Sequence, residues 1–156
     1  MNLRDEAVAL GLVEKFTVAM GSTGTETGHR ITKLAEEKYG LVSKLVSRGG
    51  DAVHGYLHEK LAAHYRAKNP GMQIAKEHRL PDGHFVDILV GDLPVEVNVS
   101  NAPEAERENL VKNVAAFGKC LLISNNQLKL EAIRNRLDPE VRQKVAFKLV
   151  YQALND

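Results

Sequence analysis

Apolar residues recur with two different periods along this chain, and their order predicts an α/β fold. After Gly49 and Gly50, residues 51–69 repeat apolar side chains every four positions, which is the spacing of one helix face. Asp51 is suited to cap this helix, and Pro70 ends it because proline cannot continue a helix. The repeated apolar residues are Val53, Leu57, Leu61 and Tyr65.

Three short strands are predicted next. Residues 72–80, 84–91 and 95–100 are rich in β-branched and aliphatic side chains. Residues 81–83 and 92–94 contain proline, aspartate or glycine and form the turns between them. A helix and three strands in a meander are therefore expected from residue 51 to residue 100.

The remainder of the chain is predicted to be mainly helical. A polar helix at 103–117 and a buried strand at 119–124 are followed by helices at 127–137 and 139–154. A mixed central sheet flanked by helices suits this order. The last helix carries an apolar stripe, which packs either on the chain's own sheet or on a second copy in a homodimer. The stripe consists of Val141, Val145, Leu149 and Ala153.

Residues 1–48 are expected to form an N-terminal helix and β-wing extension to a domain at 49–156. The pattern predicts a helix at 3–13, a strand at 14–20, a Gly-rich loop at 21–28 and a helix at 29–47 that is interrupted at Gly40. This order resembles the latter half of a winged-helix module. A trimmed winged helix, a dimerisation arm and a plain helical extension remain alternatives.

Composition adds few constraints. The 156 residues are 44% hydrophobic and 26% charged, with a formal net charge of +1. No apolar run reaches the roughly 20 residues that cross a bilayer, and an acidic N-terminus does not resemble a secretion signal. A cytoplasmic protein is therefore expected. The single cysteine, Cys120, lies in an apolar stretch and is expected to be buried.

Two acids interrupt the predicted strands. Asp87 lies within an otherwise apolar strand, and Glu96 lies within the next strand. A hairpin can bring both carboxylates to the same end of the sheet, beside a backbone carbonyl. Such oxygen ligands suit Mg²⁺ or Mn²⁺. The alternative is that both acids face water.

The segment HFVDILVGDLPVEVNVS resembles the motif of the PD-(D/E)XK nuclease superfamily, whose members include restriction endonucleases and Holliday junction resolvases. Asp87 matches the first acid and Glu96 the second, whereas Asn98 stands where the family has lysine. Glu77 supplies a further acid on the preceding strand. With its flanking helices and strand, the resemblance covers roughly residues 49–137.

This resemblance implies a divalent-metal-dependent endonuclease that hydrolyses phosphodiester bonds of DNA, including branched DNA. Mg²⁺ or Mn²⁺ would be held by Asp87, Glu96 and the Val97 carbonyl. Asn98 cannot supply the positive charge of the family's lysine, so Lys112 on the following helix is the candidate for a relocated cation, with Arg107 second. The alternatives are a catalytically inactive DNA-binding or assembly module and a winged-helix transcription regulator.

Two histidines lie one helical turn apart. His54 and His58 share a helix face and can bind zinc. However, HGYLHE lacks the glutamate between the histidines that HExxH zinc hydrolases have. His54 is therefore expected near the metal, where the family's opening helix often offers an acid, and His58 is expected in solvent. Glu59 is another candidate for that acid.

Overall fold

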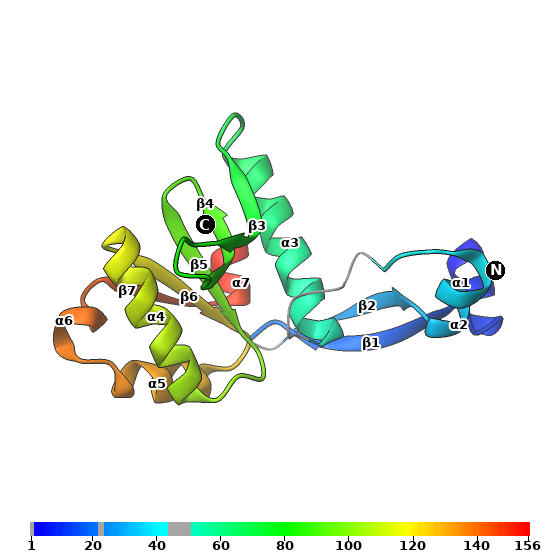
Figure 1. Cartoon of the computed structure of the whole chain (residues 1–156). Coiled ribbons are helices and arrows are strands. Elements are labelled where there is room, and N and C mark those ends of the chain that lie inside the picture. Colours follow the sequence, from blue (N-terminus) through cyan, green and yellow to red (C-terminus); the bar gives the residue numbers. More distant parts are fainter. Residues whose placement is uncertain (1, 22–23, 44–50) are drawn as a thin grey trace.

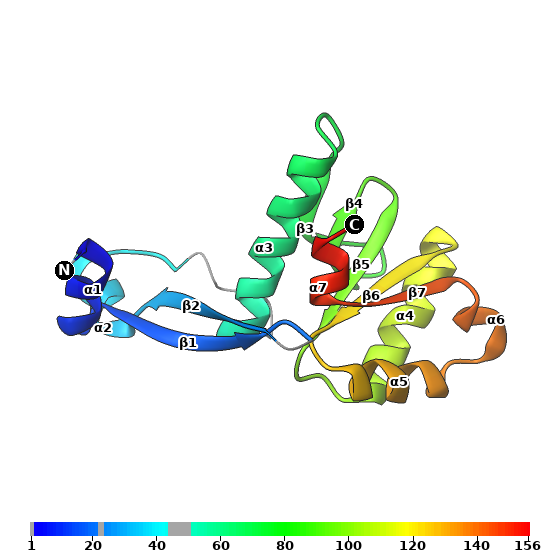
Figure 2. The ribbon, with the colours of Figure 1, turned by 180° about the vertical axis from the view of Figure 1, so that it is seen from behind.

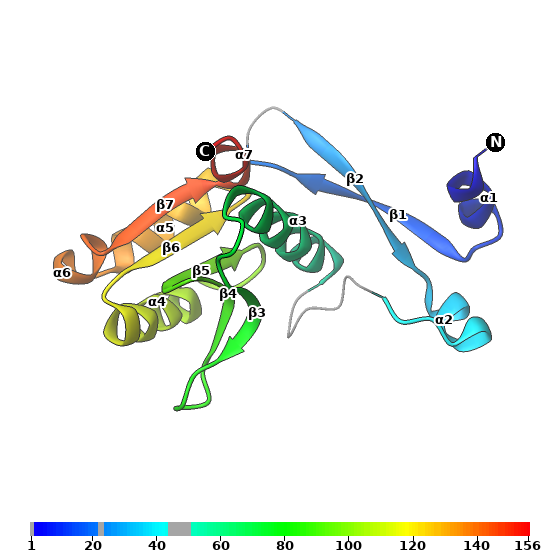
Figure 3. The ribbon, with the colours of Figure 1, turned by 90° about the horizontal axis from the view of Figure 1, so that it is seen from above.

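The chain folds into a body and an arm, which the computed structural model describes over residues 2–21, 24–43 and 51–156 (Figure 1). The body contains a sheet with helices on both faces, and the arm extends away from it in all three views (Figures 1, 2 and 3). Within the described residues no helix has both the length and the hydropathy needed to cross a membrane.

A five-stranded mixed sheet forms the centre of the body. Its strands are β3 (Ile74–Arg79), β4 (Phe85–Val90), β5 (Leu93–Asn98), β6 (Cys120–Ser124) and β7 (Val145–Leu149), and they lie side by side in that order. β3, β4 and β5 form an antiparallel meander, whereas β5, β6 and β7 are parallel. The predicted α/β fold with a mixed sheet is therefore confirmed.

Helices cover both faces of the sheet (Figures 1 and 2). α3 (Ala52–Lys68) and α7 (Val150–Leu154) pack on one face. α4 (Pro103–Phe117) and α5 (Gln127–Arg136) pack on the other, and the short α6 (Pro139–Arg142) precedes β7. β-strands alternate their side chains between the two faces, so β6 contributes Leu121 and Ile123 to one apolar core and Cys120 and Leu122 to the other.

The two cores follow from this alternation. On the α3 face, Leu57 and Leu61 are fully buried against Ile88. On the α4 face, Leu110 packs with Leu122 of β6. Cys120 is buried in this second core, as expected, and burial raises the pKa of its thiol.

The arm is a two-stranded hairpin with two short helices at its distal end (Figure 1). It consists of α1 (Leu3–Ala9), β1 (Val13–Ala19), β2 (Thr25–Ile31) and α2 (Lys33–Tyr39), and β1 and β2 are antiparallel. Figure 3 shows the hairpin leaving the body beside α3. The hairpin therefore connects the distal helices to the helix that carries His54 and His58.

The proximal end of the hairpin is part of the body's core. Val18 and Met20 are buried with the apolar side chains of α3. Tyr56 donates a hydrogen bond to Glu26 at 2.5 Å, and Lys60 contacts the same carboxylate at 2.8 Å. These contacts fix the proximal end of the hairpin to α3.

Two sequence predictions were wrong. The predicted helix at 139–154 contains β7, because Val145–Leu149 pairs in parallel with β6 and completes the sheet. Its apolar stripe is therefore divided among α6, β7 and α7, and packs on the two cores of the chain itself. The predicted loop and helix start at 25–31 form β2, because pairing with β1 overrides the Gly/Thr composition. The predicted helix residues 44–47 lie outside the described residues.

Candidate metal centre

Asp87 lies where the sheet opens on both sides of β4. Toward β5, the last paired residues are Ile88 and Val95. Beyond them, the Val97 amide donates a hydrogen bond to Asp87 Oδ2 at 2.8 Å. Toward β3, Glu77 lies opposite Asp87 at a step where the ladder is not paired. The Asp87 carboxylate therefore takes the place of a strand-to-strand hydrogen bond.

The backbone of Glu77 marks the same position. Among the described residues it is the one non-glycine residue with a positive φ, 51°. This conformation costs about 1–2 kcal/mol for an L-residue with a side chain, and such outliers cluster at functional sites. Glu77 lines the same cavity as Asp87, which agrees with its expected place near the site.

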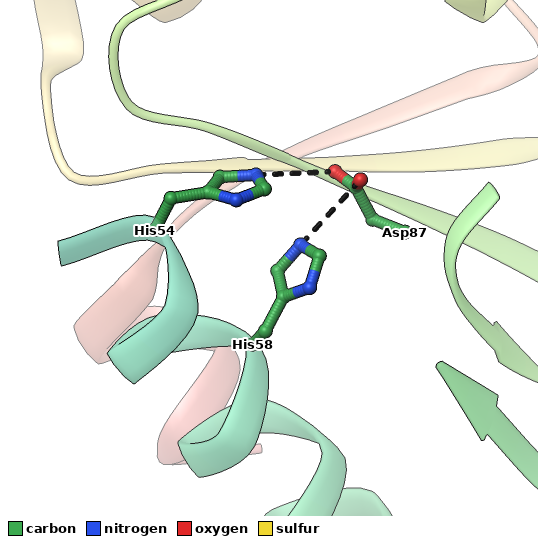
Figure 4. A group of neighbouring side chains, drawn as sticks. All are labelled: His54, His58 and Asp87. Carbon is green, nitrogen blue, oxygen red and sulfur yellow. Dashed lines mark ion pairs between the residues drawn. The ribbon is translucent and has the colours of Figure 1, made fainter. Parts of the chain in front are cut away.

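His54 and His58 extend from α3 toward Asp87 (Figure 4). Asp51 caps the helix by accepting a hydrogen bond from the His54 amide at 3.0 Å, which fixes the first turn. His54 Nε2 lies 3.7 Å from Asp87 Oδ2, and His58 Nε2 lies 3.5 Å from Asp87 Oδ1. His54 Nε2 also donates to the Val97 carbonyl at 3.1 Å. Both imidazoles therefore converge on one carboxylate.

The expectation that His58 is solvated was wrong. Its exposed fraction is 2%, because the i, i+4 spacing turns it to the same sheet-facing side as His54. Glu59, considered as an additional acid of the site, is turned toward β3 and pairs with Lys76 instead.

The electrostatics of the three groups are coupled. Burial alone would raise the pKa of Asp87, but the adjacent imidazoles of His54 and His58 hold it well below its usual value. Burial alone would lower the pKa of His54, but the hydrogen bond and charge of Asp87 outweigh this effect and raise it. Asp87 is therefore ionised at neutral pH, as an anionic metal ligand must be.

Glu96 lies at the same cavity but is deeply buried. Its exposed fraction is 2%, and Oε1 accepts a hydrogen bond from Asn113 Nδ2 at 2.7 Å. Burial and the charges of Asp87 and Glu106 raise its pKa well above the usual value. Glu96 therefore retains its proton more strongly than an exposed glutamate, until a cation compensates its charge.

Asn98 does not contact the cavity. It is fully buried, and its Nδ2 donates to Glu106 Oε2 on α4 at 2.9 Å. Glu106 is also buried, and burial raises its pKa. The Asn98 amide thus connects β5 to α4 and does not line the cavity beside the carboxylates of Asp87 and Glu96.

The cavity has a volume of about 390 Å³. Asp87, Glu96, Glu77 and His54 contribute to its wall, so four of the predicted site residues meet there. Lysine and arginine are absent from the described residues that line it.

The two candidate cations lie elsewhere. Lys112 is exposed on α4, because the neighbouring position Asn113 faces the sheet. Arg107 contacts Glu104 and the carbonyl of Arg136. Neither side chain is brought to Asp87 and Glu96.

Comparisons with known proteins add no assignment. No family model, curated protein or solved structure matches this chain. The chemistry that the site supports therefore follows from its own geometry.

That geometry permits metal binding. His54, His58 and Asp87 each offer a ligand atom, and these atoms lie within 4.8 Å of one another. The Val97 carbonyl, expected as a ligand, lies beside them but accepts a hydrogen bond from His54. Two imidazoles and a carboxylate beside a cavity form a set of donors that suits a divalent cation.

Sequence reasoning missed two residues of the site. Glu106 and Asn113 lie on the buried face of α4 with Leu110 and Val114. The sequence signal that could have identified them is that both polar residues lie on the helix face that also carries Leu110 and Val114. A polar side chain buried on such a face is costly unless it has a hydrogen-bond partner.

Proposed function

We propose that this chain is a divalent-metal-dependent nuclease that hydrolyses phosphodiester bonds of DNA. One observation carries the proposal: Asp87 and Glu96, from adjacent strands, line one cavity together with Glu77. Carboxylates gathered at such a cavity are the ligands that Mg²⁺ and Mn²⁺ prefer. A divalent ion bound there would polarise a phosphodiester and lower the pKa of water beside it.

The element order supports the proposal. The resemblance to PD-(D/E)XK nucleases implies a helix, a three-stranded meander, a helix and a further strand. The chain has this succession in α3, β3, β4, β5, α4 and β6. The acids of the resembling motif also meet in space, although eight residues separate Asp87 from Glu96 in the sequence.

The two carboxylates have different protonation behaviour. Asp87 has a lowered pKa and is ionised before any metal arrives. Glu96 has a raised pKa, so its ionisation becomes favourable when a cation enters the cavity. Metal binding is therefore expected to release a proton from Glu96.

The remainder of the cavity wall suits a phosphate-bearing substrate. Ser100, Asn101 and Asn109 line it beside the acids. Hydroxyl and amide groups are common hydrogen-bond donors to DNA phosphates. These neutral donors can orient a backbone phosphate without the sequence-specific contacts that base edges provide.

A catalytically inactive DNA-binding or assembly module is the second candidate. The observation that favours it is the hydrogen bond from Asn98 to Glu106. Through this bond, the residue at the motif's lysine position connects β5 to α4 and supplies no positive charge. A winged-helix regulator has less support, because residues 1–48 contain seven lysines and arginines against six acids. Seven minus six leaves a net charge of only +1, which is a weak attraction for DNA.

The decisive assay is cleavage of supercoiled plasmid and of a four-way DNA junction in Mg²⁺ or Mn²⁺. Wild type is compared with Asp87→Asn, which removes the charge but keeps an oxygen that can accept from the Val97 amide. Asp92→Asn is the matched control, since Asp92 is exposed in the next turn and pairs with Lys119. Metal-dependent cleavage that is abolished by Asp87→Asn and kept by Asp92→Asn supports the nuclease. If the wild type does not cleave DNA in the presence of metal, the catalytically inactive module is the remaining candidate.

A further inference from the structure

We propose that His54, His58 and Asp87 bind a zinc-class transition-metal ion in preference to Mg²⁺. The inference names the metal of the cavity described above. Only the use of that metal in hydrolysis rests on the proposed function. Metal binding itself requires no DNA substrate and is measured separately.

The distances suit such an ion. Two ligands that each lie about 2.0–2.1 Å from a tetrahedral zinc ion are about 3.3 Å apart. The two imidazole Nε2 atoms lie 3.7 and 3.5 Å from the nearest Asp87 oxygens. Ligand atoms of all three residues lie within 4.8 Å of one another. Small side-chain adjustments would therefore bring all three ligand atoms within bonding distance of one ion.

His58 provides an independent observation. Its Nε2 is buried and makes no hydrogen bond with any residue that the structure describes. A buried polar atom without a hydrogen bond costs about 1–3 kcal/mol, so most such atoms have a partner. His58 Nε2 points toward Asp87 (Figure 4). An ion placed between them would satisfy the atom.

The ligand chemistry selects the metal. Imidazole nitrogen suits zinc, copper, iron and nickel, whereas Mg²⁺ prefers carboxylates, carbonyls and water. Two of the three donors are imidazoles, from His54 and His58. The carboxylates of Glu96 and Glu77 alone would favour Mg²⁺, but they lie outside the cluster of converging ligand atoms.

One side of the cluster is open. His54 and Asp87 line the cavity of about 390 Å³, so a further ligand can approach from it. Three protein ligands with an open position are typical of catalytic zinc sites rather than structural ones. The ion would also bring positive charge to a cavity whose described lining contains no lysine or arginine.

The competing explanation is that the histidines only brace Asp87. In that case His54 keeps its hydrogen bond to the Val97 carbonyl, and the cluster is complete without metal. Metal binding instead requires His54 Nε2 to exchange this hydrogen bond and its proton for the ion. The two explanations therefore differ in whether the imidazole rings respond to added metal.

The test is titration of metal-free protein with Co²⁺, followed through its visible d–d absorption, and then with Zn²⁺ as competitor. We expect one Co²⁺ per chain, displacement by equimolar Zn²⁺, and no displacement by a large excess of Mg²⁺. His58→Asn should weaken binding about 100-fold or more, because even loss of an outer-shell partner costs 10–100-fold. His64→Asn, on the same helix but outside the cluster, should bind as wild type does.

A second measurement uses only the wild-type chain and so does not depend on a variant that folds. Imidazole NMR signals of His54 and His58 should shift on addition of Zn²⁺, while those of the other four of the six histidines stay in place. No Co²⁺ or Zn²⁺ binding, unshifted His54 and His58 signals, or displacement by equimolar Mg²⁺ would overturn the inference. Zinc binding without DNA cleavage would refute only the nuclease, and Mg²⁺-dependent cleavage without zinc binding would refute only the inference.

Discussion

The Val97 amide donates a hydrogen bond to the Asp87 carboxylate at 2.8 Å, where β4 and β5 stop pairing. A side chain thus occupies a place that backbone would fill in a regular sheet. His54 Nε2 approaches the same oxygen, Oδ2, whereas His58 Nε2 approaches Oδ1. In this position Asp87 also lines the cavity of the site.

The first prediction concerns the pH dependence of stability in the metal-free protein. The lowered pKa of Asp87 contributes stability above the unfolded value of about 3.9, and this is lost as pH falls through the folded pKa. The raised pKa of His54 contributes stability below about 6.5, and this is lost as pH rises through the folded pKa. The interaction between Asp87 and His54 should therefore stabilise the folded protein most between about pH 4 and 6.5. Urea unfolding of wild type and His54→Asn across pH 3–9 checks this; a constant difference between them would contradict it.

The second prediction separates charge from packing at Glu96. Because its pKa is raised, Glu96→Gln should leave the free energy of unfolding at neutral pH unchanged or increased, provided that an amide oxygen still accepts from Asn113. Glu96→Ala should cost about 1–3 kcal/mol, since the buried Asn113 amide loses its acceptor. Both variants should lose metal-dependent cleavage. Equal destabilisation by both would show that the charge of Glu96 is needed for folding.

The third prediction concerns Lys112. Because Lys112 is exposed and outside the cavity wall, Lys112→Ala should change DNA cleavage by no more than about twofold, the scale of an ordinary surface substitution. The measurement is the single-turnover cleavage rate in Mn²⁺, with Asp87→Asn as the inactive reference. A 100-fold fall in the cleavage rate of Lys112→Ala would contradict this prediction and support Lys112 as the relocated cation.

The fourth prediction concerns attachment of the arm. Glu26 accepts hydrogen bonds from Tyr56 and Lys60, and burial together with Glu26 raises the pKa of Tyr56 to about 12. Glu26→Gln should lower that pKa and cost about 1 kcal/mol, since the partners are partly exposed. Spectrophotometric titration of tyrosine and hydrogen exchange at the β1–β2 amides measure both effects. The control is Glu14→Gln, which removes an ion pair with Arg30 farther along the hairpin; equal effects of the two variants would contradict the assigned attachment.

Much of the fold could be predicted from the sequence where local signals agree. The bounds of α4 follow from Pro103 at its first turn and Gly118, which adopts φ 75° just after its end. β7 could not be predicted, because four-residue spacing of Val145 and Leu149 suits a helix as well as alternate positions of a strand. Its strand form depends on parallel pairing with β6, which is a tertiary contact.

The site was predictable in part for a similar reason. Asp87 and Glu96 could be selected because they interrupt strand patterns. The role of His58 could not, since its burial depends on how α3 rests on the sheet. The absence of Lys112 from the cavity likewise follows from the rotation of α4, which turns Asn113 inward.

Calorimetric titration of Mn²⁺ measures whether Asp87 anchors a divalent metal in this cavity. Wild type and Asp92→Asn should bind Mn²⁺ with the same affinity and release a proton, which repetition in buffers of different ionisation enthalpy detects. Asp87→Asn should show no measurable binding while remaining folded. Equal Mn²⁺ binding by all three proteins, or none by wild type, would contradict the account.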